Sequence, residues 1–439
     1  METYGALSLI PIFVLFAMAF TTQRSLEPLF VAAIVGHIII YKTNFATAWI
    51  DSLYKVMCSK HMVWLILVVT LFGSLIALLE KSGGLSSFAL HARKFATSRK
   101  KSLVTTWLLG SVFFLDDYLH NLTTASTMKH ITDSYGVKRT ELAYIVNSNA
   151  GNLCCLMPIS SWVVFFAGLL ETSGFVVGSA TGTYLRCIPY LFYCWIAIIM
   201  SLLFALGIVP AIGPMKSIDP ELLNDEGKPA TGNGKQSVLN FLLPVVTLVA
   251  VTVICDNEIL YGVMASLVVC AVTFLGTRTM SYDEFFKALM QGMKNMVFID
   301  VLLIVAFTLK EANDTLGLAP YIISVVKPIM KGGFLPAVTF IVCIIYAYFT
   351  SCFWSMAAVM LPIVIPLAQG MNVNVFLVLG AVFSAAAFGS QSCLFSDALI
   401  MCSAATDIST TDHGVTTLPY ALIGAGISLV LYLIGGFVL

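Results

Sequence analysis

Long apolar segments recur along the whole chain and constrain its fold more than any other feature. A helix that crosses the hydrocarbon core of a bilayer needs about 20 mainly apolar residues. Segments of roughly this kind lie at residues 5–20, 28–44, 62–80, 103–115, 142–172, 186–209, 237–255, 258–276, 295–309, 334–349, 355–370, 374–402 and 418–438. Since we expect some of them to be half-helices or hairpins, the sequence predicts an all-α polytopic membrane protein with about 10–12 transmembrane helices.

Composition supports this class and argues against others. Of the 439 residues, 59% are hydrophobic and 10% are charged, whereas a soluble domain has about 25% charged residues. The formal net charge is zero, so there is no electrostatic case for a nucleic-acid partner, and the lipid bilayer is the expected partner. The first apolar segment has no basic region before it and no small-residue cleavage site after it, which favours a retained membrane helix over a signal peptide.

The most hydrophilic connection divides the chain into two halves of similar length. It covers residues 213–236 and contains three prolines and mixed charges. We therefore expect an N-terminal membrane repeat at 1–212, a linker at 213–236 and a C-terminal membrane repeat at 237–439. The most basic connection, 81–101, is expected on the cytoplasmic side of the cell (inner) membrane by the positive-inside rule.

Four polar clusters interrupt the apolar segments. They cover residues 113–124, 147–152, 350–355 and 389–397. Small and polar residues at membrane depth indicate broken helices, whose free backbone groups must be satisfied by a cavity, an ion or a substrate. Two clusters fall in each half at similar spacing, which predicts an internal duplication with one shared site between the repeats.

Three carboxylates in these clusters are the main candidates for ion binding. Asp116 and Asp117 are adjacent, and side chains of adjacent helical residues point about 100° apart, so we expect one of them to face the site. The alternative is that both end a helix at the membrane interface. Asp397 stands alone in an apolar segment beside Ser396. A carboxylate at membrane depth can bind Na⁺ or carry a proton.

The neutral polar residues have two interpretations. Asn147, Asn149 and Asn152 can orient a substrate, or they can form hydrogen bonds between helices without contacting any ligand. His120 is a candidate proton relay. Asp300 is expected to be structural, in a charge pair with Lys294 or Lys310.

Three residues just before the last apolar segment are expected to have no role in the site. Asp407, Asp412 and His413 are expected at the surface.

Catalytic and nucleotide-binding motifs are missing from the sequence. It contains no Walker A motif, no His-Glu-x-x-His, no Gly-x-Ser-x-Gly and no dinucleotide-binding glycine pattern. We therefore expect neither an enzyme nor an ATP-driven pump, and no cofactor beyond Na⁺ or H⁺ as coupling ion. The potassium filter motif Thr-Val-Gly-Tyr-Gly is also missing. A channel remains an alternative, which saturable, gradient-coupled flux would separate from a carrier.

Three segments carry a family resemblance: FFLDDY at 113–118, LAYI at 142–145 with PISSW at 158–162, and the stretch 380–397 with TLPYA at 417–421. Together they resemble the NhaC-type Na⁺/H⁺ antiporter family of the ion-transporter superfamily. FFLDDY at 113–118 resembles the family's Phe-Asp-Asp-Tyr helix break. LAYI at 142–145, followed by PISSW at 158–162, resembles a second family segment. The stretch 380–397, followed by TLPYA at 417–421, resembles the family's late Gly-Asp-His-Cys-Ser-Pro-x-Ser-Asp stretch and last helix start.

This chain departs from the family pattern where the family has further charged groups. GSQSCL at 389–394 stands in place of Gly-Asp-His-Cys-Ser-Pro, and VNSNAGN at 146–152 in place of Ile-Asp-Ser-Thr-Ala-Ala-Pro. SCFWSM at 351–356 differs from Gly-Ser/Thr-Ser-Trp-Gly-Thr. Fewer acids weaken an all-oxygen cation site, and more amides and hydroxyls suit a polar organic solute.

The resemblance implies two inverted repeats, a scaffold part and a transport part, and alternating access of the elevator type. It implies exchange of Na⁺ for H⁺, with a Na⁺- or H⁺-coupled carrier of an amino acid or small carboxylate as the alternative. A homodimer is a family expectation. We expect Asp117 and Asp397 to bind Na⁺ or H⁺ alternately. The residues expected to build the site are Asp116, Asp117, His120, Asn121, Asn147, Ser148, Asn149, Ser351, Ser390, Gln391, Ser396 and Asp397.

Overall fold

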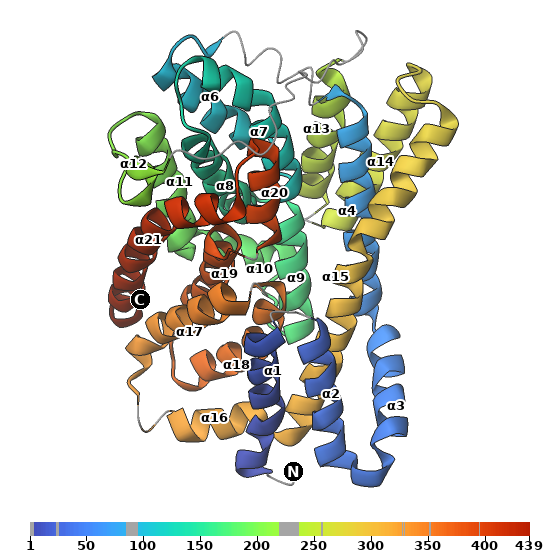
Figure 1. Cartoon of the computed structure of the whole chain (residues 1–439). Helices are drawn as coiled ribbons and strands as arrows, with labels where there is room; N and C mark the ends of the chain where they lie inside the picture. The colour runs from blue at the N-terminus through green and yellow to red at the C-terminus, as the bar shows by residue number, and fades with distance from the viewer. Residues whose placement is uncertain are drawn as a thin grey trace.

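The chain folds into helices that are long and apolar enough to cross a membrane. The computed structural model describes residues 4–22, 26–84, 95–218, 237–255, 258–326, 328, 330–350, 353–394 and 396–439, and all its elements are helical in that part of the chain (Figure 1). Eight helices there meet the length and hydropathy of a membrane span, or up to ten if each of two bent helix pairs counts as one span. The protein is therefore an all-α, multi-pass membrane protein, as the sequence predicts.

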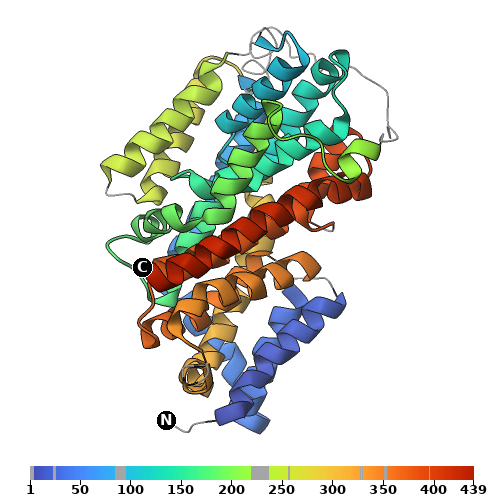
Figure 2. The same cartoon turned by 90° about the vertical axis from the view of Figure 1, so that its left-hand side faces the viewer.

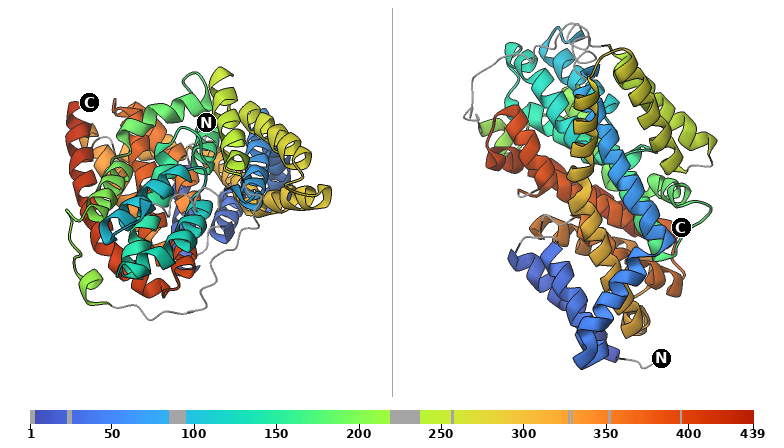
Figure 3. Two further views of the ribbon diagram at one scale, coloured as in Figure 1. Left: turned by 90° about the horizontal axis from the view of Figure 1, so that it is seen from above. Right: turned by 90° about the vertical axis from the view of Figure 1, so that its right-hand side faces the viewer.

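Two long helices cross at the centre of one group of helices. They are α4 (Lys60–Lys81) and α15 (Tyr282–Leu316), and their crossing is visible at the right of Figure 3. Gly73 and Gly292 face each other there: a Cβ added at Gly292 would lie 2.5 Å from the Cα of Ser74 and closer still to the carbonyl oxygen of Gly73. Small residues let membrane helices approach this closely and pack without a hydrophobic driving force.

Further helices pack around this crossing, and we call the whole group the scaffold. Its other members are α1 (Ile10–Thr22), α2 (Leu26–Tyr41), α3 (Phe45–Met57), α13 (Leu239–Ile254) and α14 (Ile259–Gly276). Figure 1 shows α2 and α3 at one end of the scaffold and α13 and α14 at the other. Members from the two halves of the chain therefore lie at opposite ends, as inverted repeats require.

The second group is built on four interrupted helix pairs, and we call it the broken-helix group. The pairs are α6 (Arg99–Val112) with α7 (Asp117–Ser134), α8 (Arg139–Leu156) with α9 (Ser161–Ser173), α17 (Leu335–Thr350) with α18 (Phe353–Gly370), and α19 (Val375–Ser392) with α20 (Asp397–Thr406). The second helices of the pairs start 44 residues apart in each half of the chain (117 to 161 and 353 to 397). This equal spacing is the clearest sign of the internal duplication.

The remaining elements connect or cover these pairs. They are α10 (Ala180–Cys187), α11 (Phe192–Ala205), α12 (Pro214–Ser217), α16 (Leu318–Val326), α21 (Thr410–Val438) and the short 3₁₀ turns η1 (Gly5–Leu9), η2 (Lys42–Asn44), η4 (Ile188–Tyr190) and η5 (Gly332–Phe334). Figure 2 shows α21 running unbroken across one face of the molecule. The bend at Leu191, between η4 and α11, is 58°.

The first two breaks have local causes, and the second lies at a different position from the one expected. Asp116 and Ser160 cap the helices that follow them, and Pro158 has no N–H to continue α8. The polar cluster at 147–152 was expected to break a helix, and this prediction is wrong: α8 continues through it to Leu156. Its amides bind neighbouring helices instead of interrupting the backbone.

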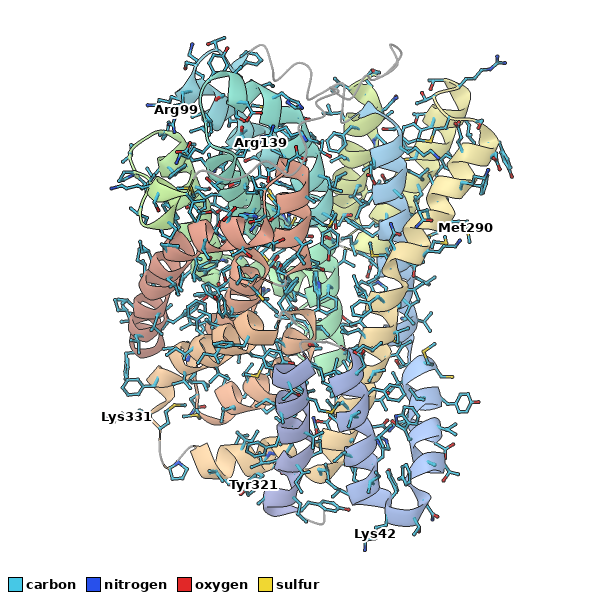
Figure 4. All side chains as sticks on the ribbon, viewed as in Figure 1. Lys42, Arg99, Arg139, Met290, Tyr321 and Lys331 are labelled. Atoms are coloured by element: carbon cyan, nitrogen blue, oxygen red, sulfur yellow. The ribbon has the colours of Figure 1, made fainter. Side chains whose placement is uncertain are left out.

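Ion pairs gather at the end of the molecule where Figure 4 places Arg99 and Arg139, opposite the end with Lys42. Arg139, only 4% exposed, donates to Asp133 at 2.9 Å and to Asp407 at 2.8 Å, and Lys129 also donates to Asp407 at 2.6 Å. Asp407 is thus held in a partly buried network, so its expected surface position is wrong.

His413 also differs from the expectation. It lies within α21, fully buried, with Nδ1 2.9 Å from the hydroxyl of Ser403. The prediction that His413 lies at the surface is therefore wrong too. The helix α21 begins at Thr410, before the apolar segment 418–438 from which the sequence predicts it.

Candidate functional site

A small cavity lies where the scaffold meets the broken-helix group. On the scaffold side it is lined by Val69, Phe72, Met296 and Ile299 from α4 and α15. On the other side it is lined by Asp116, Asp117, Tyr118, Ser161, Phe165 and Trp354, among others, at the starts of α7, α9 and α18. Its volume is about 30 Å³, and a water needs about 10–15 Å³, so it has room for a bare cation or a few waters.

Asp116 is fixed by the backbone of the helix that it caps. Its Oδ1 accepts hydrogen bonds from the N–H groups of Tyr118 and Leu119, both at 3.1 Å. The residue is 4% exposed. A carboxylate in this position satisfies two free N–H groups and is stabilised by the helix dipole, so one of its two oxygens is committed to structure.

Asp117 differs from its neighbour because it has a free oxygen. It is the first residue of α7, it is 1% exposed, and its Oδ2 is buried without a hydrogen-bond partner among the described residues. The hydroxyl of Ser161 and the indole N–H of Trp162 are likewise buried without a hydrogen bond of good geometry, and they lie close to the carboxylates of Asp116 and Asp117, respectively. Asp117 also lies within electrostatic range of the carboxylates of Asp116 and Asp397.

Asp397 joins the site from the other half of the chain. It is the first residue of α20, and the hydroxyl of Tyr118 donates a hydrogen bond to its Oδ2. Asn121 donates to the carbonyl oxygen of Ala398 at 3.2 Å, so a second residue of α7 binds the start of α20. Ser396, fully buried, donates to the carbonyl oxygen of Ser390 at 2.7 Å and steadies the break before Asp397.

The three carboxylates have no basic partner in the described part of the chain. Among the residues that the structure describes, no lysine, arginine or histidine forms an ion pair with Asp116, Asp117 or Asp397. Within the same residues, no group of three His, Cys, Asp or Glu side chains could hold a metal ion. A cation bound here would therefore complete its shell with hydroxyls, backbone carbonyls or water.

His120 and Asn121 continue the polar face of α7 away from Asp117. His120 is fully buried, and neither ring nitrogen has a hydrogen-bond partner among the described residues. A Cβ added at Gly110 would lie 2.6 Å from its Cε1, so α6 gives the imidazole room only because residue 110 is glycine. The Oδ1 of Asn121 and the hydroxyl of Thr124 are also buried and unpartnered.

Gln391 is the centre of a separate hydrogen-bond network. Its Nε2 donates to Ser148 Oγ at 2.8 Å, and its Oε1 accepts from Asn152 and from Tyr193, both at 2.8 Å. Asn147 donates to its backbone carbonyl at 2.9 Å. This network joins α8, α11 and α19, and it uses the amides to hold helices together.

Two further candidates lie apart from the carboxylates. Asn149 points to another side of α8, where it donates to the carbonyl of Trp107 at 3.2 Å and accepts from Ser201 at 2.9 Å. Ser390 is buried at the contact between α19 and Gly151. Ser351 lies outside the described residues.

Asp300 stands on the scaffold near the same cavity, one residue from Ile299. Thr70 donates to its Oδ2 at 3.0 Å, and its Oδ1 is buried and unpartnered. Lys310 pairs with Asp314 instead, at 3.2 Å. Within the described part of the chain Asp300 therefore has no charge partner, and the expected pair with Lys294 or Lys310 is wrong.

Several residues at the cavity carried no signal in the sequence. Val69, Phe72, Met296 and Ile299 look like any lipid-facing residues until the fold brings α4 and α15 against the breaks. Tyr118 could have been found, because it follows the two acids directly within a polar cluster.

Comparisons with known proteins agree with this architecture. A sequence model of the Na⁺/H⁺ antiporter family matches residues 153–437. An uncharacterised protein of Haemophilus influenzae is 26% identical over 471 aligned positions, which cover 98% of this chain and 91% of that protein.

Two solved transporter structures share the fold. MtrF of Neisseria gonorrhoeae, described with a class of antimetabolite efflux pumps, is 14% identical with a TM-score of 0.69, over 98% of this chain and 95% of that one. The YdaH transporter of Alcanivorax borkumensis is 10% identical with a TM-score of 0.69, over 98% of both chains. The family match covers well over half of the sequence, including the second and fourth breaks and Asp397. This chain is therefore a membrane transporter and belongs to the Na⁺/H⁺ antiporter family.

Proposed function

We propose that the protein exchanges Na⁺ for protons by alternating access, with Asp117 and Asp397 carrying the exchanged charge. The observation that supports this most is the meeting of three carboxylates at helix breaks without a basic partner among the described residues. A buried carboxylate without a counter-charge must be neutralised. A proton and Na⁺ are alternative ways to do so, which makes their binding mutually exclusive and couples the two fluxes.

The site's electrostatics favour a cation over the alternative of a small carboxylate. A carboxylate solute would meet Asp116, Asp117 and Asp397 with no basic side chain to offset the repulsion. The positive N-terminal end of α7 already has Asp116 and Asp117 beside it, and that of α20 has Asp397. The amides that suggested an organic solute bind protein groups instead: Asn152 and Asn147 bind Gln391, and Asn149 binds Trp107 and Ser201.

The surroundings of the cavity suggest how access alternates. The scaffold side of the cavity is lined by the apolar side chains of Val69, Phe72, Met296 and Ile299. Such a wall offers no hydrogen bonds to break when the broken-helix group slides past it. We propose elevator-type movement of that group against α4 and α15, in the inner cell membrane, with residues 81–101 on the cytoplasmic side and with a homodimer as the working assembly.

The test is ion flux in sealed proteoliposomes that contain a pH-sensitive dye. Addition of Na⁺ outside should move protons out of wild-type vesicles, and Asp117→Asn or Asp397→Asn should abolish this movement. Asp283→Asn is a matched control, because Asp283 is exposed at the start of α15 and forms a surface ion pair with Lys287. Coupled flux that survives in both site variants would refute the assignment of these two residues.

A further inference from the structure

We propose that the cavity between the breaks and the scaffold also takes a small alkylammonium ion, with its N–H groups on Asp117 and Ser161 and its carbon atoms against Trp354. This inference rests on the proposed function, because it assigns a second class of cation to the same transport site. It begins from a mismatch between the charge of the cavity and the chemistry of its walls.

Most of the side chains that line the cavity are apolar. Phe72, Met296 and Ile299 face it from the scaffold, and Phe165 and Trp354 face it from the broken-helix group. A bare Na⁺ needs a shell of oxygen ligands and gains nothing from contact with hydrocarbon. An ammonium ion with alkyl groups gains from both parts of this surface, because its charge binds carboxylates while its carbon atoms leave water.

The free acceptors match an ammonium head group. One oxygen of Asp116 is committed to the backbone of α7, whereas Asp117 Oδ2 and Ser161 Oγ are buried and unpartnered. An ammonium group is donor-only, with up to three N–H groups. It could donate to both of these acceptors at once.

The aromatic wall is rigid and suited to a cation. The ring of Trp354 lies 4.7 Å from that of Trp162 and 4.6 Å from that of Phe165, the latter at 71°. Trp162 in turn stacks on Phe353 at 5.3 Å and 8°. Tryptophan is the best aromatic partner for a cation, and these contacts fix its ring at the starts of α9 and α18 before any ligand arrives.

Size and charge narrow the ligand class. A cavity of about 30 Å³ admits a head group with one or two carbon atoms. A carboxylate on the ligand is excluded, because no basic side chain among the described residues pairs with the three acids of the site. The class is therefore short-chain monoamines in their protonated form, and amino acids fall outside it.

The experiment is equilibrium binding to the full-length protein in detergent, which avoids leakage of neutral amines across a bilayer. Displacement of ²²Na⁺ is measured with methylammonium, ethylammonium, butylammonium and, as a zwitterionic control, glycine. We expect methylammonium or ethylammonium to displace Na⁺ and to bind more tightly than butylammonium, and glycine to have no effect. Displacement by glycine with the same affinity as methylammonium would overturn the proposal.

Two variants at the aromatic wall sharpen the test. Trp354→Leu should lower the ratio of ethylammonium affinity to Na⁺ affinity by about 5-fold or more, and Trp354→Phe, which keeps a ring, should restore part of it. An unchanged ratio in a folded Trp354→Leu protein would refute the aromatic contact. If that protein does not fold, the comparison of Trp354→Phe with wild type decides, because phenylalanine is the weaker cation partner.

The outcomes also separate this inference from the proposed function. Na⁺ binding without displacement by any alkylammonium ion would refute the ammonium site and leave Na⁺/H⁺ exchange in place. Direct alkylammonium binding by calorimetry without Na⁺ binding would support the ammonium site and refute the choice of Na⁺. If the Asp117→Asn variant still binds both Na⁺ and alkylammonium ions as wild type does, the role of Asp117 in both proposals is refuted.

Discussion

The hydroxyl of Tyr118 donates a hydrogen bond to the carboxylate of Asp397, a residue 279 positions further along the chain. The two residues stand at the starts of α7 and α20, and each of these helices follows a break in its own half of the protein. Asn121 adds a second bond to the start of α20. At the other end of α20, Arg139 and Lys129 hold Asp407. The short helix that carries Asp397 is thus fixed at both ends to α7 and α8.

Removal of the tyrosine hydroxyl should weaken ion binding. A hydrogen bond to a charged group contributes about 1.5–3 kcal/mol, so Tyr118→Phe should lower Na⁺ affinity by roughly 10- to 150-fold. The measurement is ²²Na⁺ binding in detergent. Tyr54→Phe is the control, since Tyr54 is 68% exposed on α3; equal affinities in the two variants would contradict the role of this bond.

Loss of Arg139 should destabilise the helix that carries Asp397. Its guanidinium is buried between Asp133 and Asp407 and also donates to the carbonyl of Thr406 at 3.2 Å. Removing one partner of a buried ion pair costs about 3–5 kcal/mol, so Arg139→Ala should lower the Tm clearly. Arg186→Ala, at an exposed position of α10, is the matched control and should leave the Tm close to wild type. A Tm for Arg139→Ala equal to that of the control would show that the network is dispensable.

A methyl group at Gly292 should disrupt the scaffold. The added Cβ would collide with the backbone of Gly73 and Ser74, which are themselves in a helix and cannot yield without separating α4 from α15. Overpacking typically costs about 1–3 kcal/mol, and a clash with backbone lies at the upper end of that range. Gly276→Ala, where the new Cβ meets nothing within 4 Å, is the control. Thermal unfolding followed by tryptophan fluorescence distinguishes the two, and identical curves would mean that the helices do not cross here.

Gln391 should prove more important for stability than for ion binding. Gln391→Leu strands the amide of Asn152 and the hydroxyls of Ser148 and Tyr193 in the protein interior. Each stranded buried group costs about 1–3 kcal/mol, so the Tm should fall. A lower Na⁺ affinity with an unshifted Tm would instead place Gln391 in the ion site.

The sequence predicts the frame of this fold well because breaks and spans depend on local chemistry. Asp116 marks the start of α7 by its capping preference, and Asp397 lies in the first turn of α20, where the helix dipole favours an acid. The cluster around Asn149 misled because an amide that breaks a helix and an amide that binds a neighbouring helix have the same local sequence. Only the position of α19 shows that Asn147 and Asn152 bind Gln391.

The apolar wall of the site could not be predicted from composition. Met296 and Ile299 lie on a helix whose other residues include the exposed Val297 and Phe298. Lipid and the carboxylates both face apolar side chains here, so the sequence does not distinguish the two environments. Their role depends on how two helices from different halves of the chain cross.

The equal 44-residue spacing of the half-helices has a consequence for the two sides of the membrane. In the duplicated frame Asp117 corresponds to Phe353, and Asp397 corresponds to Ser161. The positions of the half-helices are thus related by the duplication, but the acidic residues at their starts are not. If the repeats exchange conformations during transport, the inward-facing and outward-facing forms surround the same carboxylates with different neighbours. The half-saturating cation concentration should therefore differ between the two sides of the membrane. The ion gradient at which net exchange stops should be unaffected by this difference, because stoichiometry alone determines it.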